Sequence, residues 1–284
     1  MKRVLITGRN SYIGNALEEW LTQWPEKYNV DKISVRDESW RTSNWQNYDV
    51  LVHVAGIAHN SSDASLEGEY YRVNRDLTLE VAKKAKSDNI KHFVNMSSII
   101  IFGTKQDEIT PLTTPQPDNF YGDSKLQAEE KLNALSDQSF KIAHVRPPMV
   151  YGKNSKGNFP LLAKISVKTP IFPKYKNKRS MIYIKNLAEL LRLVIDIEID
   201  GYLHPQNPEL VQTSDLVGSI ARANSHKLFE TKIFNFIIKP LSNVGIVHKV
   251  FGNLYYSYDM WDGNLDYQRY TLDESIQDIY QQLG

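Results

Sequence analysis

A glycine turn between a strand pattern and a helix pattern, close to the N-terminus, constrains the fold more than any other feature. The apolar run Val4 to Thr7 leads into the stretch ITGRNSYIG, residues 6–14, and an amphipathic segment follows from Ile13 to Trp24. A strand, a glycine turn and a helix in this order direct backbone N–H groups and a helix N-terminus at a phosphate. We expect Gly8 to make the tight turn and Gly14 to let the helix pack on the sheet. The pattern indicates a dinucleotide site, with a simple helix-capping turn as the alternative.

The middle position of such a turn is usually glycine, because a phosphate must approach the backbone there. Ser11 occupies it in this chain. A small hydroxyl side chain takes little room and can donate a hydrogen bond. The substitution therefore weakens the pattern without removing it.

Strand and helix patterns alternate through the first half of the chain. Short apolar runs predict strands at Val4 to Thr7, Ile33 to Val35, Val50 to Ala55, His92 to Ser97 and Ile142 to Val145. Helical patterns lie between them at Ile13 to Trp24, Tyr70 to Lys86 and Tyr121 to Leu135. This alternation predicts an α/β fold with a doubly wound, Rossmann-type parallel sheet covered by helices on both faces.

The alternation fails from Lys153 onward, where proline and loop residues cluster. We therefore expect residues 1–152 to form a dinucleotide-binding domain and residues 153–284 a smaller, mainly substrate-binding region. Within that region, about residues 180–198 should return to the Rossmann sheet. Helices are expected at Ile184 to Ile197, Ser214 to Ala223 and Asp273 to Gln282.

Composition narrows the class of partner. The chain has 34 Lys plus Arg against 33 Asp plus Glu, a net charge of +1, which offers no overall field for nucleic acid or an anionic membrane. Its 284 residues include no cysteine, so disulfides, thiolate metal sites and thiol catalysis are excluded. No apolar run is long enough for a signal peptide or a membrane span. We expect a cytoplasmic protein that binds a small molecule, with neither nucleic acid nor membrane as a partner.

Tyr121 and Lys125 are four residues apart in a helical pattern, so their side chains share one face. A free tyrosine titrates near ~10, and a nearby ammonium favours the phenolate and lowers that pKa. Such a pair is suited to proton transfer, and the lysine could also reach a ribose hydroxyl. Ser98 ends the fourth predicted strand, at the edge where open α/β sheets bind ligands. The alternative is an exposed helical pair and a serine that caps a strand end.

Four motifs in order resemble the extended short-chain dehydrogenase/reductase family, specifically its nucleotide-sugar epimerases, dehydratases and 4-keto reductases. They are ITGRNSYIG, the run DVLVHVAG at residues 49–56, Met96-Ser97-Ser98, and the Tyr-x-x-x-Lys element at Tyr121 and Lys125. The resemblance runs from Met1 to about Ala188. More narrowly, the chain is similar to bacterial capsule and O-antigen enzymes that act on UDP-linked 6-deoxy-N-acetylhexosamines in the synthesis of surface polysaccharide precursors.

The resemblance implies a catalytic set of Ser98, Tyr121 and Lys125, in which Ser98 bonds the reacting oxygen of the substrate. It also implies a homodimer formed through two helices per subunit. The residues implied for cofactor binding are Gly8, Arg9, Ser11, Tyr12, Ile13, Gly14, Arg36, Ala55, Gly56, Tyr121, Lys125 and Pro148.

The residues after Ser98 bear on the reaction. Sugar dehydratases of this family carry an Asp-Glu pair there, and decarboxylating relatives carry a glutamate. This chain reads Ile99-Ile100-Ile101-Phe102-Gly103, which supplies no carboxylate as acid or base. The epimerase-reductases that make GDP-fucose rely on a cysteine, and this chain has none. Reduction of a 4-keto group and 4-epimerisation are the two reactions that remain.

Two arginines favour NADP(H) over NAD(H) as the cofactor. NAD-dependent relatives end the second strand in Asp, whose carboxylate accepts bonds from the ribose and repels a 2′-phosphate. Here the run Ile33 to Val35 is followed by Arg36, and Arg9 lies in the glycine turn. Guanidinium groups bind phosphate well. The alternative is that Arg36 pairs with a neighbouring carboxylate, Asp37 or Glu38, on the surface.

The family also implies a substrate grip. An Asn-aromatic element and an arginine before a strand, matched here by Asn158-Phe159 and Arg179, would hold the diphosphate and uracil of a UDP-sugar. A solvated basic loop is the alternative explanation of Arg179. His53, His59 and His92 lack metal-ligand spacing, and we expect no metal site, although His59 could line the cleft. The sequence therefore predicts an NADPH-dependent UDP-4-keto-6-deoxy-N-acetylhexosamine reductase. A UDP-N-acetylhexosamine 4-epimerase is the first alternative and a non-catalytic NADP(H)-binding redox sensor the second.

Overall fold

A six-stranded parallel sheet forms the centre of the molecule, in a computed structural model that describes residues 1–58, 63–241, 245–260 and 265–281. Its strand order is β10-β6-β4-β3-β1-β2. Successive strands are therefore added toward one edge from β1 to β2 and toward the other edge from β3 onward, with the reversal point between β1 and β3. The strands are β1 (Lys2–Thr7), β2 (Tyr28–Ile33), β3 (Val50–His53), β4 (His92–Met96), β6 (Lys141–Val145) and β10 (Gly201–Leu203). A doubly wound sheet places its ligand site at the carboxyl ends of the strands beside this reversal point.

Both faces of the sheet are apolar, because successive side chains of a strand point to opposite faces. Val4, Ile6, Val52 and Val94 join one buried cluster, together with Leu17 and Leu21 of α1 and residues of α6 such as Leu187 and Leu191. The intervening residues join a second cluster with α3 and the end of α4, among them Leu5, Leu51, Phe93, Val81 and Leu132.

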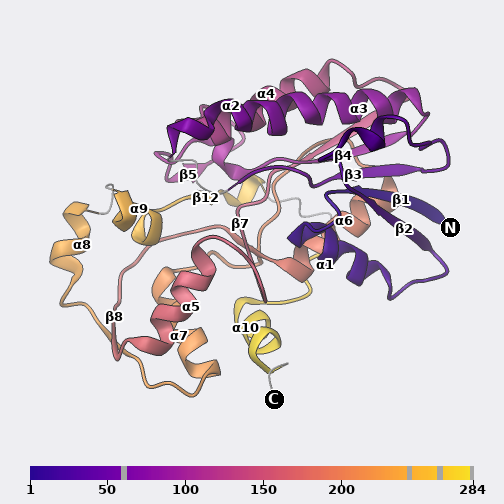
Figure 1. Cartoon of the computed structure of the whole chain (residues 1–284). Helices are drawn as coiled ribbons and strands as arrows, with labels where there is room; N and C mark the ends of the chain where they lie inside the picture. Colours follow the sequence, from indigo (N-terminus) through magenta and orange to yellow (C-terminus); the bar gives the residue numbers. More distant parts are fainter. Residues whose placement is uncertain (59–62, 242–244, 261–264, 282–284) are drawn as a thin grey trace.

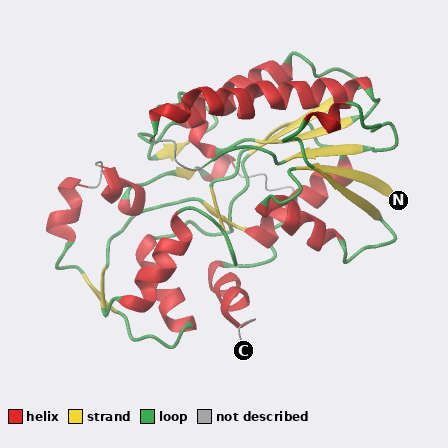
Figure 2. Cartoon of the chain, in the orientation of Figure 1, coloured by secondary structure: helices red, strands yellow, loops and turns green. Residues whose placement is uncertain are grey.

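Figures 1 and 2 show the resulting layers, with α3 and α4 above the sheet and α1 and α6 below it. The helices that cover the sheet are α1 (Tyr12–Leu21), α2 (Glu67–Tyr70), α3 (Thr78–Ser87), α4 (Phe120–Asn133) and α6 (Ile184–Ile197). The doubly wound Rossmann-type fold predicted from the alternation is confirmed.

A second lobe lies beside the carboxyl ends of the strands (Figure 1). Its core is formed by side chains of α5, α7 and α10 and by aromatic residues such as Tyr151 and Phe172. The helices are α5 (Asn158–Lys168), α7 (Thr213–Ala223), α8 (Asn235–Leu241), α9 (Gly245–Phe251) and α10 (Leu272–Gln281). Short parallel strand pairs join segments of the chain, namely β7 (Met149–Tyr151) with β9 (Met181–Tyr183), β8 (Ile171–Pro173) with β11 (Phe229–Thr231), and β5 (Glu108–Ile109) with β12 (Tyr255–Tyr256).

Two expected elements differ from the structure in more than their end residues. The second strand runs from Tyr28 to Ile33 instead of Ile33 to Val35, because an edge strand with one solvated side carries polar residues and Val35 is buried beyond it. The helix expected from Tyr70 to Lys86 is interrupted by a π-helical segment, Tyr71–Leu77. Gln282, the expected end of the last helix, lies outside the described residues, and the division of the chain at residue 152 stays a prediction.

The helices in the described part of the chain are all too short or too polar to span a bilayer.

Candidate active site

Gly8 makes the sharp turn at the end of β1. Its φ of +83° lies in the left-handed region, and a Cβ atom here would lie 3.3 Å from the Cα atom of Ala55. Its N–H donates to the carbonyl oxygen of Ile33 over 2.9 Å, which ties the turn to the end of β2. Only glycine suits this position, so the reason given for it from the sequence holds.

Ser11 caps α1, because its Oγ accepts a hydrogen bond from the backbone N–H of Gly14 over 3.0 Å. A Cβ atom at Gly14 would lie 2.5 Å from that oxygen and 3.2 Å from Cγ2 of Val54. The first turn of α1, with Tyr12 and Ile13, carries no acidic side chain. The positive end of the helix therefore faces the turn uncompensated, as an anion site requires. Residues 8–14 thus fit a pyrophosphate, and the Ser11 hydroxyl keeps its proton for donation.

The loop after β3, which holds Ala55 and Gly56, is fixed by a residue that the sequence analysis did not select. The Asn74 side chain accepts from the N–H of Ile57 over 2.9 Å and donates to its carbonyl oxygen over 3.0 Å. The same amide donates to Oγ of Ser124 on α4 over 3.2 Å. A Cβ atom at Gly56 would lie 3.0 Å from Asn74 Oδ1 and 3.3 Å from Lys125 Nζ. The signal that could have identified Asn74 is its helical spacing, because Tyr70 four residues before it and Leu77 three residues after it place the amide on an apolar face.

Ser98, Tyr121 and Lys125 meet where β4 ends and α4 begins. Asn119 caps α4 by accepting from the N–H of Gly122 over 3.0 Å. A hydrogen bond joins the side chains of Ser98 and Tyr121. The buried Lys125 ammonium donates to the carbonyl oxygen of Met96, the last residue of β4, over 2.8 Å. Ser98 and two side chains of α4 thus converge at the carboxyl edge of the sheet.

The protonation of this set differs from the expectation in one respect. Burial raises the pKa of Tyr121, and the hydrogen bond from Ser98 opposes that shift only in part. Lys125 does not lower the pKa of Tyr121 as expected, and its ammonium donates to the Met96 carbonyl oxygen instead. Burial lowers the pKa of Lys125 to about 8. Tyr121 is therefore a phenol at neutral pH, the form that donates a proton.

The side chains of the segment after Ser98 pack in the protein interior and supply no acid or base. Ile99–Phe102 forms a 3-10 turn in which Ile99, Ile101 and Phe102 are buried. They share an apolar cluster with Tyr256 and Leu254 of the second lobe. Pro148 lies buried just beyond β6, at the same carboxyl edge.

The two arginines expected at the adenosine ribose lie beyond the ends of neighbouring strands, β1 and β2. Arg9 and Arg36 are both exposed, and neither forms an ion pair with any residue that the structure describes. The carboxylates that could have paired with Arg36 are engaged elsewhere. Asp37 accepts from the N–H of Ser39 over 3.0 Å, and Glu38 pairs with Arg41. This arrangement suits an anionic group at the ribose.

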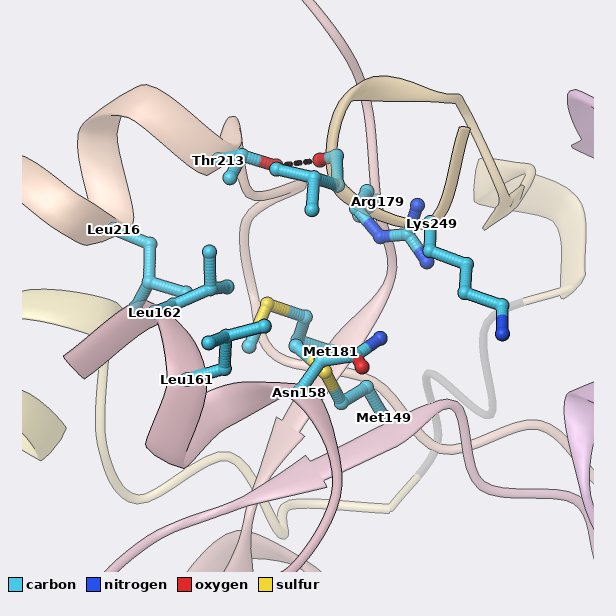
Figure 3. Close-up of a pocket in the computed structure, with 10 residues that line it drawn as sticks. Met149, Asn158, Leu161, Leu162, Arg179, Met181, Thr213, Leu216 and Lys249 are labelled. Atoms are coloured by element: carbon cyan, nitrogen blue, oxygen red, sulfur yellow. Dashed lines mark hydrogen bonds between the residues drawn. The ribbon is translucent and has the colours of Figure 1, made fainter. Parts of the chain in front are cut away.

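A pocket in the second lobe contains the expected substrate residues Asn158 and Arg179 (Figure 3). Arg179 donates from Nη1 to the carbonyl oxygen of Gly252 over 2.9 Å, and burial lowers its pKa. Lys249 of α9 adds a second cation, which the sequence analysis missed because α9 was not predicted. The remaining lining is mainly apolar and is formed by Met149, Leu161, Leu162, Met181, Thr213, Leu216 and Val250. Two cations beside an amide and an apolar wall fit an anionic ligand with a flat, less polar part.

The histidines have structural partners. His53 bridges two elements, with Nδ1 2.8 Å from Oγ1 of Thr7 and Nε2 3.0 Å from Oγ1 of Thr78. His92 contacts the carbonyl oxygen of Ile199 over 2.8 Å, and His59 lies outside the described residues. Across the ranges that the structure describes, no three His, Cys, Asp or Glu side chains are grouped as metal ligands.

The fold and this arrangement of serine, tyrosine and lysine define a Rossmann-type protein of the short-chain dehydrogenase/reductase class. The chain belongs to the NAD dependent epimerase/dehydratase family, whose profile it matches over residues 4–200. Members of this family are NAD(P)-dependent enzymes that act on nucleotide sugars.

Two curated relatives are 4-epimerases. A UDP-glucose 4-epimerase of Vibrio cholerae is 32% identical over 219 residues, which cover 69% of this chain and 67% of the relative. The N-acetyl-alpha-D-glucosaminyl-diphospho-ditrans,octacis-undecaprenol 4-epimerase of Escherichia coli O157:H7 is 27% identical over 218 residues, or 70% of this chain and 65% of that protein. The aligned region spans about two thirds of the length of these relatives.

Solved structures of both reaction types share the fold. A dTDP-4-dehydrorhamnose reductase from Bacillus anthracis in complex with NADP superposes with a TM-score of 0.77 at 18% identity and covers 100% of both chains. A UDP-glucuronic acid 4-epimerase from Bacillus cereus in complex with NAD superposes with a TM-score of 0.76 at 17% identity, covering 98% of this chain and 96% of that one. At these identities the likeness shows the fold alone.

Proposed function

We propose that this chain uses NADPH to reduce the 4-keto group of a UDP-linked 4-keto-6-deoxy-N-acetylhexosamine. The observation that carries the proposal is the position of two arginines, Arg9 and Arg36, beyond the ends of β1 and β2, where neither has an ion-pair partner among the described residues. Guanidinium groups at this place favour a 2′-phosphorylated cofactor. Such a cofactor is exchanged after each reduction, whereas an epimerase keeps its nucleotide bound.

The residues after Ser98 support the second part of the proposal. Ile99, Ile101 and Phe102 are buried and apolar, so this segment offers no acid or base for expelling water from the sugar. The 4-keto group must therefore be made by a separate dehydratase before the sugar reaches this site.

NADPH, when bound, supplies the hydride for carbon 4 of the sugar. The Tyr121 hydroxyl donates a proton to the oxygen at carbon 4, because burial keeps it protonated at neutral pH. Ser98, already hydrogen-bonded to Tyr121, holds the same oxygen. Lys125 lies between the Met96 carbonyl and the Gly56 loop, from which its ammonium can turn toward a ribose hydroxyl.

The pocket of the second lobe supports a nucleotide-sugar substrate. Arg179 lies in a largely apolar lining, where a charge-assisted hydrogen bond to a diphosphate is stronger than in water. Asn158 at the start of α5 and Lys249 of α9 lie across the same pocket (Figure 3). Together they supply donors for the diphosphate and the base.

4-Epimerisation of a UDP-N-acetylhexosamine is the second candidate, and the two curated relatives, both 4-epimerases, favour it. It uses the same serine, tyrosine and lysine. It differs in needing a tightly held oxidised cofactor that receives the hydride and returns it to the other face of the sugar.

One pair of assays separates the candidates. The enzyme is incubated with the UDP-linked 4-keto sugar and NADPH, and separately with UDP-N-acetylglucosamine and no added nucleotide. We expect NADPH to be consumed in proportion to product in the first assay and nothing to change in the second. Formation of the 4-epimer in the second assay without NADPH consumption in the first would establish the epimerase. NADPH binding without turnover in either would indicate a sensor, and the Tyr121→Phe variant serves as the inactive control.

A further inference from the structure

One face of α8 and the preceding segment is apolar and exposed. Ile233, Phe236, Ile237 and Leu241 follow a spacing of i, i+3, i+4 and i+8, which places them on one side of a helical path. Ile233 is 72% exposed and Phe236 is 73% exposed, and Phe229 of β11 is 77% exposed. We name Ile233, Phe236, Ile237 and Leu241 the α8 face.

This pattern is the reverse of that of an ordinary surface helix, which turns its apolar side to the core. Within α8, Ile238 is the buried hydrophobic side chain. Single exposed apolar residues are common. A group of exposed aromatic and branched side chains, in contrast, marks a surface that binds another protein or a membrane. Figure 1 places α8 at the outer edge of the second lobe, far from the central sheet.

The charge around the α8 face is positive. Residues 225–251 contain four lysines and one glutamate, a net charge of +3 in a chain whose total is +1. The glutamate, Glu230, pairs with Lys174 over 3.1 Å. Lys227 and Lys232 are exposed and form no ion pair with residues in the described ranges. The expectation of no membrane partner rested on the total charge and on the lack of a membrane-spanning run, and neither reveals this local excess of positive charge.

We propose that the α8 face docks on an anionic lipid bilayer. Aromatic and branched side chains enter the boundary between headgroups and acyl chains, while Lys227 and Lys232 meet lipid phosphates, as in interfacial helices. A second copy of the chain fits the face less well. A two-fold contact through it would bring the lysines of both copies together, and like charges repel.

Docking would also place the substrate pocket near the membrane. α8 packs against α9, and Lys249 and Val250 of α9 line the pocket. A bilayer beneath α8 therefore lies close to one wall of the site. The reaction does not require docking, because a water-soluble UDP-sugar can enter and leave the site from the aqueous side. Docking would instead release the product close to membrane enzymes that use it.

The test is sedimentation of the full chain with vesicles of phosphatidylcholine alone and of phosphatidylcholine mixed equally with phosphatidylglycerol. We expect binding to the anionic vesicles and a loss of binding as salt is raised. The double variant Ile233→Ser/Phe236→Ser should bind at least about tenfold more weakly, since less apolar area enters the interface. Lys232→Glu should weaken binding to anionic vesicles by more than about fivefold, since each lysine near the surface contributes about that factor and the glutamate is repelled.

Leu112→Ser is the matched control, because Leu112 is 93% exposed on a different part of the chain. It should bind vesicles like the unaltered protein. Melting curves and NADPH oxidation in solution, measured for each variant, keep loss of folding and failure of the proposed reaction separate from loss of docking. Equal binding to neutral and anionic vesicles, or no binding to either, would overturn the proposal. A change of oligomeric state in the double variant without any vesicle binding would assign the face to a second copy.

Discussion

The carboxyl edge of the central sheet and the pocket of the second lobe are built differently. At the sheet edge, polar groups of the glycine turn and of the catalytic set are already hydrogen-bonded to the protein, as in the pairs Ser11 with Gly14 and Lys125 with Met96. In the lobe, Arg179 has one backbone carbonyl as its partner and Lys249 is exposed. The contrast indicates that the sheet edge is preorganised for chemistry, whereas the lobe is completed by the ligand that it receives.

Replacing Tyr121 by Phe should have the largest effect and tests the preorganised side. Turnover is expected to fall by at least about 10²-fold, because the proton donor is lost while its packing against Tyr70 remains. Cofactor affinity should stay within about twofold, measured by quenching of protein fluorescence on titration with NADPH. Retention of more than about a tenth of the turnover would exclude Tyr121 as the acid.

The buried lysine at the sheet edge should make stability depend on pH. Burial lowers the pKa of Lys125 from 10.5 to about 8, so between these values the unfolded chain binds a proton that the folded chain lacks. The free energy of unfolding should therefore rise from pH 8 to pH 10.5, by an amount on the order of 3 kcal/mol. Below pH 8 both states are protonated and this term is constant.

Urea unfolding of the unaltered protein and of Lys125→Met, across this pH range, checks the expectation. The methionine variant should lack the rise, and the difference between the two proteins removes the contribution of the tyrosines that ionise in both. If the free energy of unfolding depends on pH in the same way in both proteins, burial does not lower the pKa of Lys125.

Arg36→Asp tests whether the sheet edge selects its cofactor by charge. The ratio of kcat/KM for NADPH to that for NADH should fall by roughly tenfold or more, because a carboxylate repels the 2′-phosphate and accepts a ribose hydroxyl. Arg41→Asp is the matched control, since Arg41 already pairs with Glu38 and Glu80. An unchanged ratio in Arg36→Asp would place any 2′-phosphate elsewhere.

Asn158→Ala should have the smallest effect and tests the lobe. A neutral hydrogen bond to the substrate contributes about 1 kcal/mol, so KM for the UDP-sugar should rise about fivefold with kcat nearly unchanged. A fall in kcat with constant KM would show that the lobe takes part in the chemical step, and the contrast between the two regions would then fail.

The sheet edge was largely predictable from the sequence, and the lobe was not. Parallel strands bring their carboxyl ends together whatever the loops between them, so Gly8, Ser98 and Tyr121 could be placed by counting elements. The walls of the pocket come from α5, α7 and α9, which meet through long-range packing that no local period records. The position of Lys249 in the pocket and the exposure of Phe236 could therefore not be predicted from the sequence.

The helical segment from Tyr70 buries polar residues that its apolar spacing does not indicate. Val73, Leu77 and Val81 recur at four-residue spacing in this segment, and Val81 is buried as such spacing indicates. In the structure Asn74 and Thr78 are buried, while Val73 and Leu77 are only half-buried. A polar side chain lies inside when it has a specific partner, and the partners here, Ile57 and His53, come from another part of the chain.

The His53 bridge has a consequence for how this region comes apart. Thr7, His53 and Thr78 form a continuous chain of hydrogen bonds that crosses from β1 through β3 to α3, beginning at the residue before Gly8. Because buried bonds of this kind are costly to leave unmade, the three elements should open together in one cooperative event and not singly. Slow, concerted amide exchange would be their common property. Loss of the His53 hydrogen bonds would then unfold β1, β3 and α3 together at the cofactor-binding edge. Unfolding of the second lobe would leave these three elements folded.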